Sequence, residues 1–121
     1  MPENQTINMQ SIYALRSISP DDGGEFLREM ITIYLQDTPQ RLAELEQALT
    51  RQDGPGLVRP AHSIKGSSGN FGATQFAKLA EDIEQQGKAG NVPGAAATYA
   101  TLQAEYARVT AELDRIARSS Q

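Results

Sequence analysis

The sequence predicts an all-α protein, an antiparallel up-and-down four-helix bundle with a short N-terminal capping helix. Along most of the chain, apolar residues recur at steps of three and four, which is the period of an amphipathic helix. Turn-forming residues separate these segments, and no segment shows the alternating pattern of a β-strand. Amphipathic helices joined by short loops bury their apolar stripes most economically as an up-and-down bundle.

Residues 9–18 and 25–50 form the first two expected helices. The first segment carries Ile12, Tyr13, Leu15 and Ile18, as expected for a short helix over one end of the bundle. The stripe of the second comprises Leu27, Met30, Ile31, Tyr34, Thr38, Leu42, Leu45 and Leu49. Asp21 or Asp22 can cap its start, and Pro39, which removes one backbone hydrogen bond, is expected to bend it. This segment therefore forms one kinked helix or, as the alternative, two shorter helices.

A turn over residues 51–56 precedes the third expected helix, with Asp53 and Pro55 as its start signals. The stripe of this helix comprises Leu57, Ala61, Ile64, Ser68 and Phe71. The helix is expected to end near Gly72. Because Pro60 lies near its first turn, we expect the helix to begin late or to be distorted there.

The last two expected helices flank a loop at residues 88–90. The shorter one ends at Gly87, and its periodic residues are Gln75, Phe76, Leu79, Ala80 and Ile83. Asn91 is the expected N-cap of the longer one, with Pro93 just inside it. The stripe of the longer helix comprises Val92, Ala95, Tyr99, Leu102, Tyr106, Val109, Leu113 and Ile116.

The length of 121 residues fits a single domain over residues 1–121, with an ordered bundle at about residues 9–118 and flexible termini. The chain has no cysteine, which excludes a disulfide framework and a thiolate zinc site and favours a reducing compartment. No apolar stretch approaches the roughly 20 residues of a membrane span, and the N-terminus lacks a signal-peptide pattern. We therefore expect a cytoplasmic protein that does not bind membranes.

The net charge of −4 argues against nucleic acid as a partner, because that binding depends on a basic patch and the sequence contains no Lys/Arg cluster. A metal site is not expected either, since His and Cys clusters are absent and Glu81, Asp82 and Glu84 are assigned to a solvated helix face. A hydrolase triad and a nucleotide-binding loop both need strand-supported geometry that is not predicted.

His62 is the single histidine of the chain, and a neutral imidazole is a good phosphoryl acceptor. It directly follows the stripe residue Ala61, so a rotation of about 100° turns it away from the core and toward solvent. Lys65 and Gly66 lie one turn further on the same face, where an ammonium can neutralise a phosphoryl group and a glycine leaves room for a protein. Gly69 continues this face, although each helical glycine costs about 1 kcal/mol relative to alanine.

Each of these residues also has a simpler explanation. A lone histidine is more often a surface residue without chemistry, and Lys65 alone is an ordinary solvated lysine. Gly66 and Gly69 can serve close helix packing. Ser67 and its neighbour at position 68 can be small residues at a crowded crossing. The combination on one helix face is what favours phosphoryl transfer.

The segment 61–73, AHSIKGSSGNFGA, closely resembles the signature of histidine-containing phosphotransfer (HPt) domains. That signature is an Ala-His-x-Leu-Lys-Gly-Ser-Ser run followed by an apolar-Gly-Ala step. Residues 79–84 resemble the fourth-helix segment of the same family, and the resemblance covers about residues 9–118. Ile64 in place of the commoner leucine, Phe71 in an apolar position and Pro60 just before the motif are departures that remove no reactive group.

The resemblance implies a phosphorelay intermediate of two-component signalling. It accepts a phosphoryl group on His62 from a receiver-domain phosphoaspartate or a kinase and passes it to a response-regulator receiver aspartate. By position, Lys65 stabilises the phosphate, Gly66 gives access, and Ser67 is a hydrogen-bonding or close-packing neighbour. Glu84 is the candidate that orients the imidazole through Nδ1, which would leave Nε2 to react.

The same resemblance implies a carrier with no kinase activity of its own and no cofactor, because Mg²⁺ belongs to the partner receiver. The expected partners are receiver domains of a hybrid sensor kinase, a response regulator or both, bound by a monomer. Ile12, Leu15, Phe26 and Ile33 are docking candidates, although the last two can instead pack under the N-terminal helix. The alternative functions are an interaction bundle that is not phosphorylated, and an HPt domain excised from a hybrid or chemotaxis-type kinase.

Overall fold

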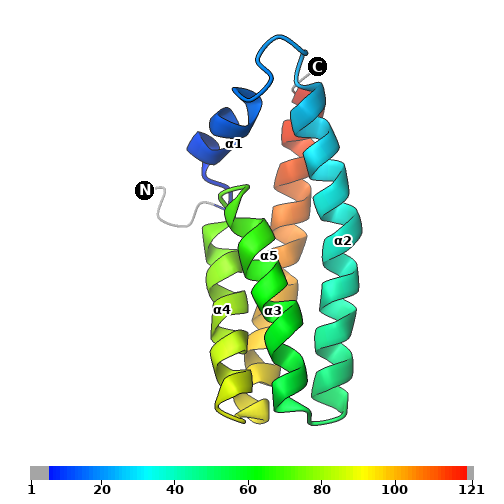
Figure 1. Ribbon diagram of the computed structural model, residues 1–121, viewed down its shortest axis with the longest axis vertical. Helices are drawn as coiled ribbons and strands as arrows, with labels where there is room; N and C mark the ends of the chain where they lie inside the picture. The colour runs from blue at the N-terminus through cyan, green and yellow to red at the C-terminus, as the bar shows by residue number, and fades with distance from the viewer. Residues whose placement is uncertain (1–5, 120–121) are drawn as a thin grey trace.

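The computed structural model of the chain describes residues 6–119, and this part of the chain is an all-helical bundle (Figure 1). Its helices are α1 (Met9–Arg16), α2 (Glu25–Thr50), α3 (Gly54–Gly69), α4 (Thr74–Lys88) and α5 (Val92–Ser119). The predicted fold class is therefore confirmed. The expected flexibility of the extreme ends concerns residues 1–5 and 120–121, which lie outside the described residues.

The bundle has two long helices and two short ones. α2 and α5 extend beyond α3 and α4 at the upper end, and α1 lies beside that upper part (Figure 1). The backbone N–H of Asn8, at the start of α1, donates to the carbonyl of Gly72 in the turn between α3 and α4 at 2.9 Å. Gly72 has a φ of +70°, and a Cβ atom on it would lie 2.8 Å from the Cβ of Asn8. The N-terminal helix is thus seated on the end of the shorter pair, as a capping helix.

Four of the helices begin at side-chain caps, including α1, where the Asn8 side chain accepts from the Gln10 backbone N–H at 3.0 Å. Of the two candidates for α2, Asp22 is the one used: its carboxylate accepts from the backbone N–H groups of Gly24 and Phe26, both at 2.9 Å. Asp53 and Asn91 each accept from the backbone N–H three residues further on, at 3.0 Å. These bonds satisfy N–H groups that a helix start leaves without partners. The predicted caps of α3 and α5 are confirmed.

The prolines interrupt neither of the helices that contain them. α2 continues through Pro39, so the alternative of two shorter helices is wrong. The expectation that Pro60 delays α3 is also wrong, because the Asp53 cap starts the helix at Gly54, well before the proline. α3 ends at Gly69, earlier than the predicted end near Gly72, since the Ser68 carbonyl accepts from two N–H groups of the following turn.

The core is built from the predicted stripes. Nearly all of their members are buried or half-buried; Gln75, at the start of α4, and the outward part of α1 are the exposed positions. Inside the core, the hydroxyl groups of Tyr34 and Ser68 are 2.6 Å apart and join α2 to α3. Burial raises the pKa of Tyr34 to about 12, although the Ser68 hydrogen bond acts in the opposite direction. None of the helices in residues 6–119 is long and apolar enough to cross a membrane.

Candidate functional site

His62 lies near the middle of α3, on the face opposite the bundle core. Its neighbour Ala61 is fully buried, whereas 66% of the His62 side chain is exposed. The imidazole Nδ1 lies 3.1 Å from the Oε2 atom of Glu84 on α4. A carboxylate at Nδ1 favours the tautomer with its proton on that nitrogen. Nε2, which has no hydrogen bond to a described residue, is therefore the nitrogen that keeps a free electron pair, on a side chain that is mostly exposed.

Glu84 is buried, with only 6% of its side chain exposed. The sequence-based assignment of this residue to a solvated face is wrong, because the crossing of α3 over α4 covers it. Its carboxylate lies 3.1 Å from the Lys65 ammonium and 3.4 Å from the Lys88 ammonium, in addition to the His62 ring. Burial by itself raises the pKa of Glu84, but the hydrogen bonds from Lys65, His62 and Lys88 outweigh it and hold the pKa below the ordinary value of 4.5. The group at the centre of the site is therefore an anion at neutral pH.

Lys88 is a site residue that the sequence interpretation missed. Its ammonium and the imidazole Nδ1 share one atom, the Oε2 of Glu84. The available signal was the four-residue spacing of Glu84 and Lys88, which places both on one face of α4. That signal alone is common on helices, and only the packing of α4 against α3 brings the pair to His62.

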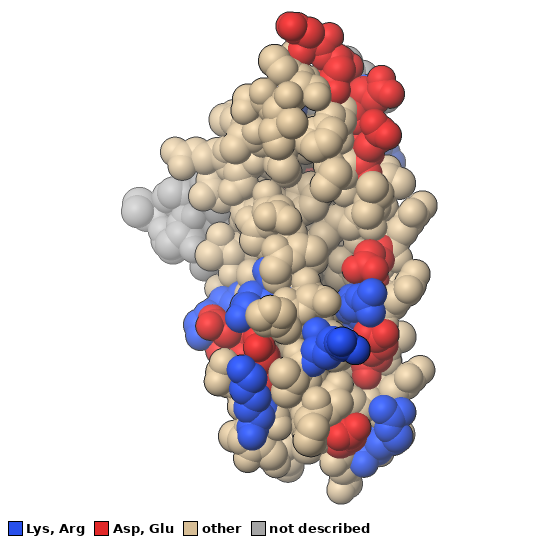
Figure 2. Space-filling model, in the orientation of Figure 1, with Lys and Arg blue, Asp and Glu red and all other residues tan. Residues whose placement is uncertain are grey.

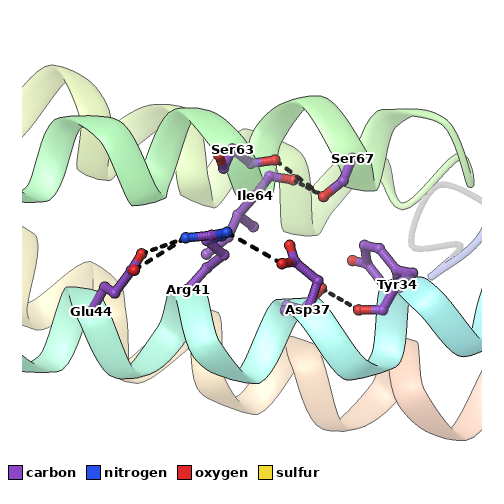
Figure 3. Close-up of polar contacts among 8 residues, drawn as sticks. Tyr34, Asp37, Arg41, Glu44, Ser63, Ile64 and Ser67 are labelled. Carbon is purple, nitrogen blue, oxygen red and sulfur yellow. Dashed lines mark hydrogen bonds and ion pairs between the residues drawn. The ribbon is translucent and has the colours of Figure 1, made fainter.

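The exposed glycines of α3 do not serve packing inside the molecule. Within residues 6–119, a Cβ atom on Gly66 or Gly69 would meet no atom within 4 Å. The packing alternative is therefore wrong for both, and the surface beside His62 is open. Ser67 donates its hydroxyl to the Ser63 carbonyl at 3.1 Å, within the same helix (Figure 3). Its predicted role as a hydrogen-bonding neighbour is thus met by its own helix and not by the imidazole.

The four docking candidates differ in exposure. Ile12 is fully buried, so its side chain belongs to the core and the prediction of a docking role for it is wrong. Leu15 is half-buried against the core, and Phe26 is also half-buried. Ile33 is 57% exposed, so it does not pack under α1. Tyr13, which the sequence interpretation did not propose for docking, is 58% exposed.

The arrangement combines an accessible nucleophile with charge control. The imidazole is held at one nitrogen and open at the other, and two ammonium groups lie around the same buried carboxylate. Ammonium groups gathered around the carboxylate that holds the ring can neutralise an anionic group that arrives there. The site therefore suits the transfer of an anionic group between a protein partner and His62.

Comparison with known proteins gives a consistent result. The Hpt domain family model matches residues 29–117. Histidine-containing phosphotransfer protein 4 of Arabidopsis thaliana is 27% identical over 109 residues, which are 88% of this chain and 86% of the plant protein. Multistep phosphorelay regulator 1 of Schizosaccharomyces pombe is 29% identical over 70% of this chain, but the match spans only 29% of the yeast protein.

Two further similarities concern a longer protein and a solved structure. Aerobic respiration control sensor protein ArcB of Escherichia coli is 29% identical over 51% of this chain, which corresponds to 8% of ArcB. The crystal structure of histidine-containing phosphotransfer protein B from Pseudomonas aeruginosa PAO1 superposes with a TM-score of 0.87 and 24% sequence identity. This superposition covers 96% of this chain and 97% of the other, and it shows a shared fold.

Proposed function

The chain belongs to the Hpt domain family, and we propose that His62 is the residue on which it carries a phosphoryl group. Its family and its named relatives make it a phosphorelay intermediate of two-component signalling. The observation that supports His62 is the exposed imidazole whose Nδ1 is held by a buried carboxylate, which leaves Nε2 with a free electron pair.

The proposed reaction is an in-line displacement at phosphorus. The electron pair of Nε2 attacks the phosphorus of a receiver phosphoaspartate, the N–P bond forms, and the aspartate oxygen leaves with the electrons of the P–O bond. The ring proton stays on Nδ1, so positive charge develops on the imidazole. Glu84, which is ionised and lies 3.1 Å from Nδ1, stabilises that positive charge. Transfer to a second receiver is the reverse displacement.

Lys65 and Lys88 neutralise the transferred group in this scheme. Both ammonium groups contact the Glu84 carboxylate that also contacts the imidazole, which keeps them beside the ring. Gly66 and Gly69 leave the approach to the ring clear. The chain itself contributes mainly positioning and charge, which is most of what phosphoryl transfer requires from a protein.

The proposed partners are receiver domains of a hybrid sensor kinase, a response regulator or both. Mg²⁺ and the rest of the catalytic machinery belong to the receiver in this proposal, and the chain works as a monomeric cytoplasmic carrier without a cofactor or kinase activity of its own. The names of two relatives support this role, since one is a multistep phosphorelay regulator and another a sensor protein.

Replacement of His62 by glutamine tests the proposal. The wild-type chain should acquire an acid-labile, base-stable phosphate from a phosphorylated receiver, and His62→Gln should acquire none, because the chain has no second histidine. Far-UV circular dichroism should be unchanged, since the His62 side chain is mostly exposed. Labelling that survives the substitution would contradict the proposal. Receiver binding without labelling of the wild type would favour a bundle that only binds.

A further inference from the structure

The fold gathers cations that are dispersed in the sequence. Arg41 and Arg51 come from α2 and its end, Arg59 and Lys65 from α3, and Lys88 from α4. Figure 2 shows basic side chains interspersed with acidic ones over the lower half of this face, whereas acidic side chains dominate its upper end, where α1 joins α2. The chain as a whole carries a net charge of −4. Four of these cations, Arg41, Arg51, Lys65 and Lys88, each have a carboxylate beside them.

Arg59 differs from the other cations in its lack of a carboxylate partner. It is exposed and lies one helical turn before His62, so it shares the exposed face of α3. No carboxylate within residues 6–119 forms an ion pair with it. By contrast, Lys65 and Lys88 are both neutralised by Glu84. The positive charge of Arg59 is thus uncompensated within the described chain.

Two more arginines lie beside it. Arg41, Arg51 and Arg59 line one shallow pocket between α2 and α3. Arg41 reaches from α2 toward α3 and pairs with Asp37 at 3.3 Å and Glu44 at 2.9 Å (Figure 3). Arg51 lies 4.0 Å from the Asp53 carboxylate, which is a long distance for an ion pair, and its side chain is largely exposed. We call these three residues the arginine surface.

We propose that the arginine surface, with Arg59 as its principal residue, docks the acidic rim of the phosphoaspartyl site on the partner protein. This inference rests on the proposed function. An aspartyl phosphate is an anion, and a site that holds Mg²⁺ beside it uses carboxylate ligands. The partner surface that approaches His62 is therefore acidic, which is complementary to Arg59 and its neighbours.

The arginine surface also affects how the partner approaches before the two proteins touch. A chain with a net charge of −4 repels an acidic partner at distances beyond contact. An uncompensated positive charge at Arg59 turns the partner toward the His62 face, which raises the association rate more than it raises the affinity. The effect is screened at distances of about 10 Å in 0.1 M salt. Transfer to and from the partner should accordingly slow as salt increases.

Charge reversal at Arg59 tests the inference against a matched control. Arg118→Glu makes the same change in net charge in the last turn of α5, at the upper end of the bundle, where the Arg118 side chain is 79% exposed. The donor is a purified receiver domain phosphorylated with acetyl phosphate, chosen as the one that labels the wild type fastest. Arg59→Glu should raise the KM for this donor about tenfold at low salt, and Arg118→Glu should change it little. Arg59→Lys, which keeps the charge, should restore most of the loss.

Transfer rates are also measured over a range of salt concentrations, and phosphoramidate serves as a second, small-molecule donor. The wild-type rate should fall as salt rises, and the rate for Arg59→Glu should be nearly independent of salt. Equal effects of Arg59→Glu and Arg118→Glu would overturn the inference. Phosphoramidate, which has no protein surface, separately tests the chemistry of His62 in the wild type. If it labels His62 and the two charge reversals behave alike with the receiver, only the arginine surface fails. If phosphoramidate and every phosphorylated receiver tried leave His62 unlabelled, the proposed function itself fails.

Discussion

Two pairs of glycines on the α3 and α4 helices serve opposite purposes. A Cβ atom on Gly87 would lie 2.7 Å from the Gly54 carbonyl oxygen and 3.1 Å from the Leu57 Cβ, so these two helices touch backbone to backbone where they cross. A Cβ atom on Gly66 or Gly69 would touch nothing within 4 Å. A helical glycine costs about 1 kcal/mol relative to alanine. Close packing offsets that cost at the crossing, whereas nothing within the described chain offsets it beside His62. The proposed access role, which leaves room for a partner beside His62, would explain the second pair.

The largest effect is expected at the crossing. Gly87→Ala should lower the free energy of unfolding by about 1–3 kcal/mol, because the new methyl group forces α3 and α4 apart. Urea denaturation followed by circular dichroism measures the change. An unchanged or higher stability would show that the crossing tolerates a side chain, and the contrast between the two glycine pairs would then disappear.

Lys88, on the exposed side of the same helices, is expected to act on the rate of phosphoryl transfer. Lys88→Ala should slow phosphoryl transfer from a receiver about tenfold, equivalent to about 1.4 kcal/mol, because one of two ammonium groups near the ring is lost. Lys78→Ala is the matched control, since Lys78 also pairs four residues away on α4, with Asp82 at 2.9 Å, but not with Glu84. Single-turnover transfer rates measure the difference. Equal rates for the two variants would remove Lys88 from the site.

Replacement of Gly66 by alanine should change stability less than Gly87→Ala does, and in the opposite direction. Gly66→Ala should raise the free energy of unfolding by up to about 1 kcal/mol, because it improves helix propensity and meets no neighbour. Transfer from the receiver should nevertheless slow, since the methyl group occupies the approach to the imidazole. Denaturation and transfer measured on one preparation test both parts. A gain in stability without any slower transfer would refute the access role.

The weakest expected effect concerns acid stability. The pKa of Glu84 is lower in the folded chain than its ordinary value of 4.5, so its ionised form stabilises the fold. That contribution is fully present above pH 4.5 and is lost as the pH falls through the folded pKa. The free energy of unfolding of Glu84→Gln should therefore decrease less than that of the wild type as the pH drops below 4.5. Parallel curves from denaturation at several pH values would argue against an ionised Glu84.

Much of the fold follows from local patterns. The three- and four-residue steps identify the helices, and Asp53 and Asn91 mark two of their starts, because caps and amphipathic periods act within a few residues. The same reasoning places His62 on the outer face, one position past the buried Ala61. The docking prediction for Ile12 is wrong because α1 carries apolar residues on more than one face, and its sequence does not reveal which face meets the bundle.

The sequence alone therefore determined the helices, their caps and the outward position of His62. Only the tertiary structure decided the surroundings of the imidazole. Glu84 becomes a buried anion with three partners because α4 packs under α3, and this packing brings Lys88 to the ring. Arg41 and Arg59 likewise become neighbours across the α2 and α3 pocket. Such contacts join residues that are distant in the chain, and their energies depend on burial and distance, which no local period specifies.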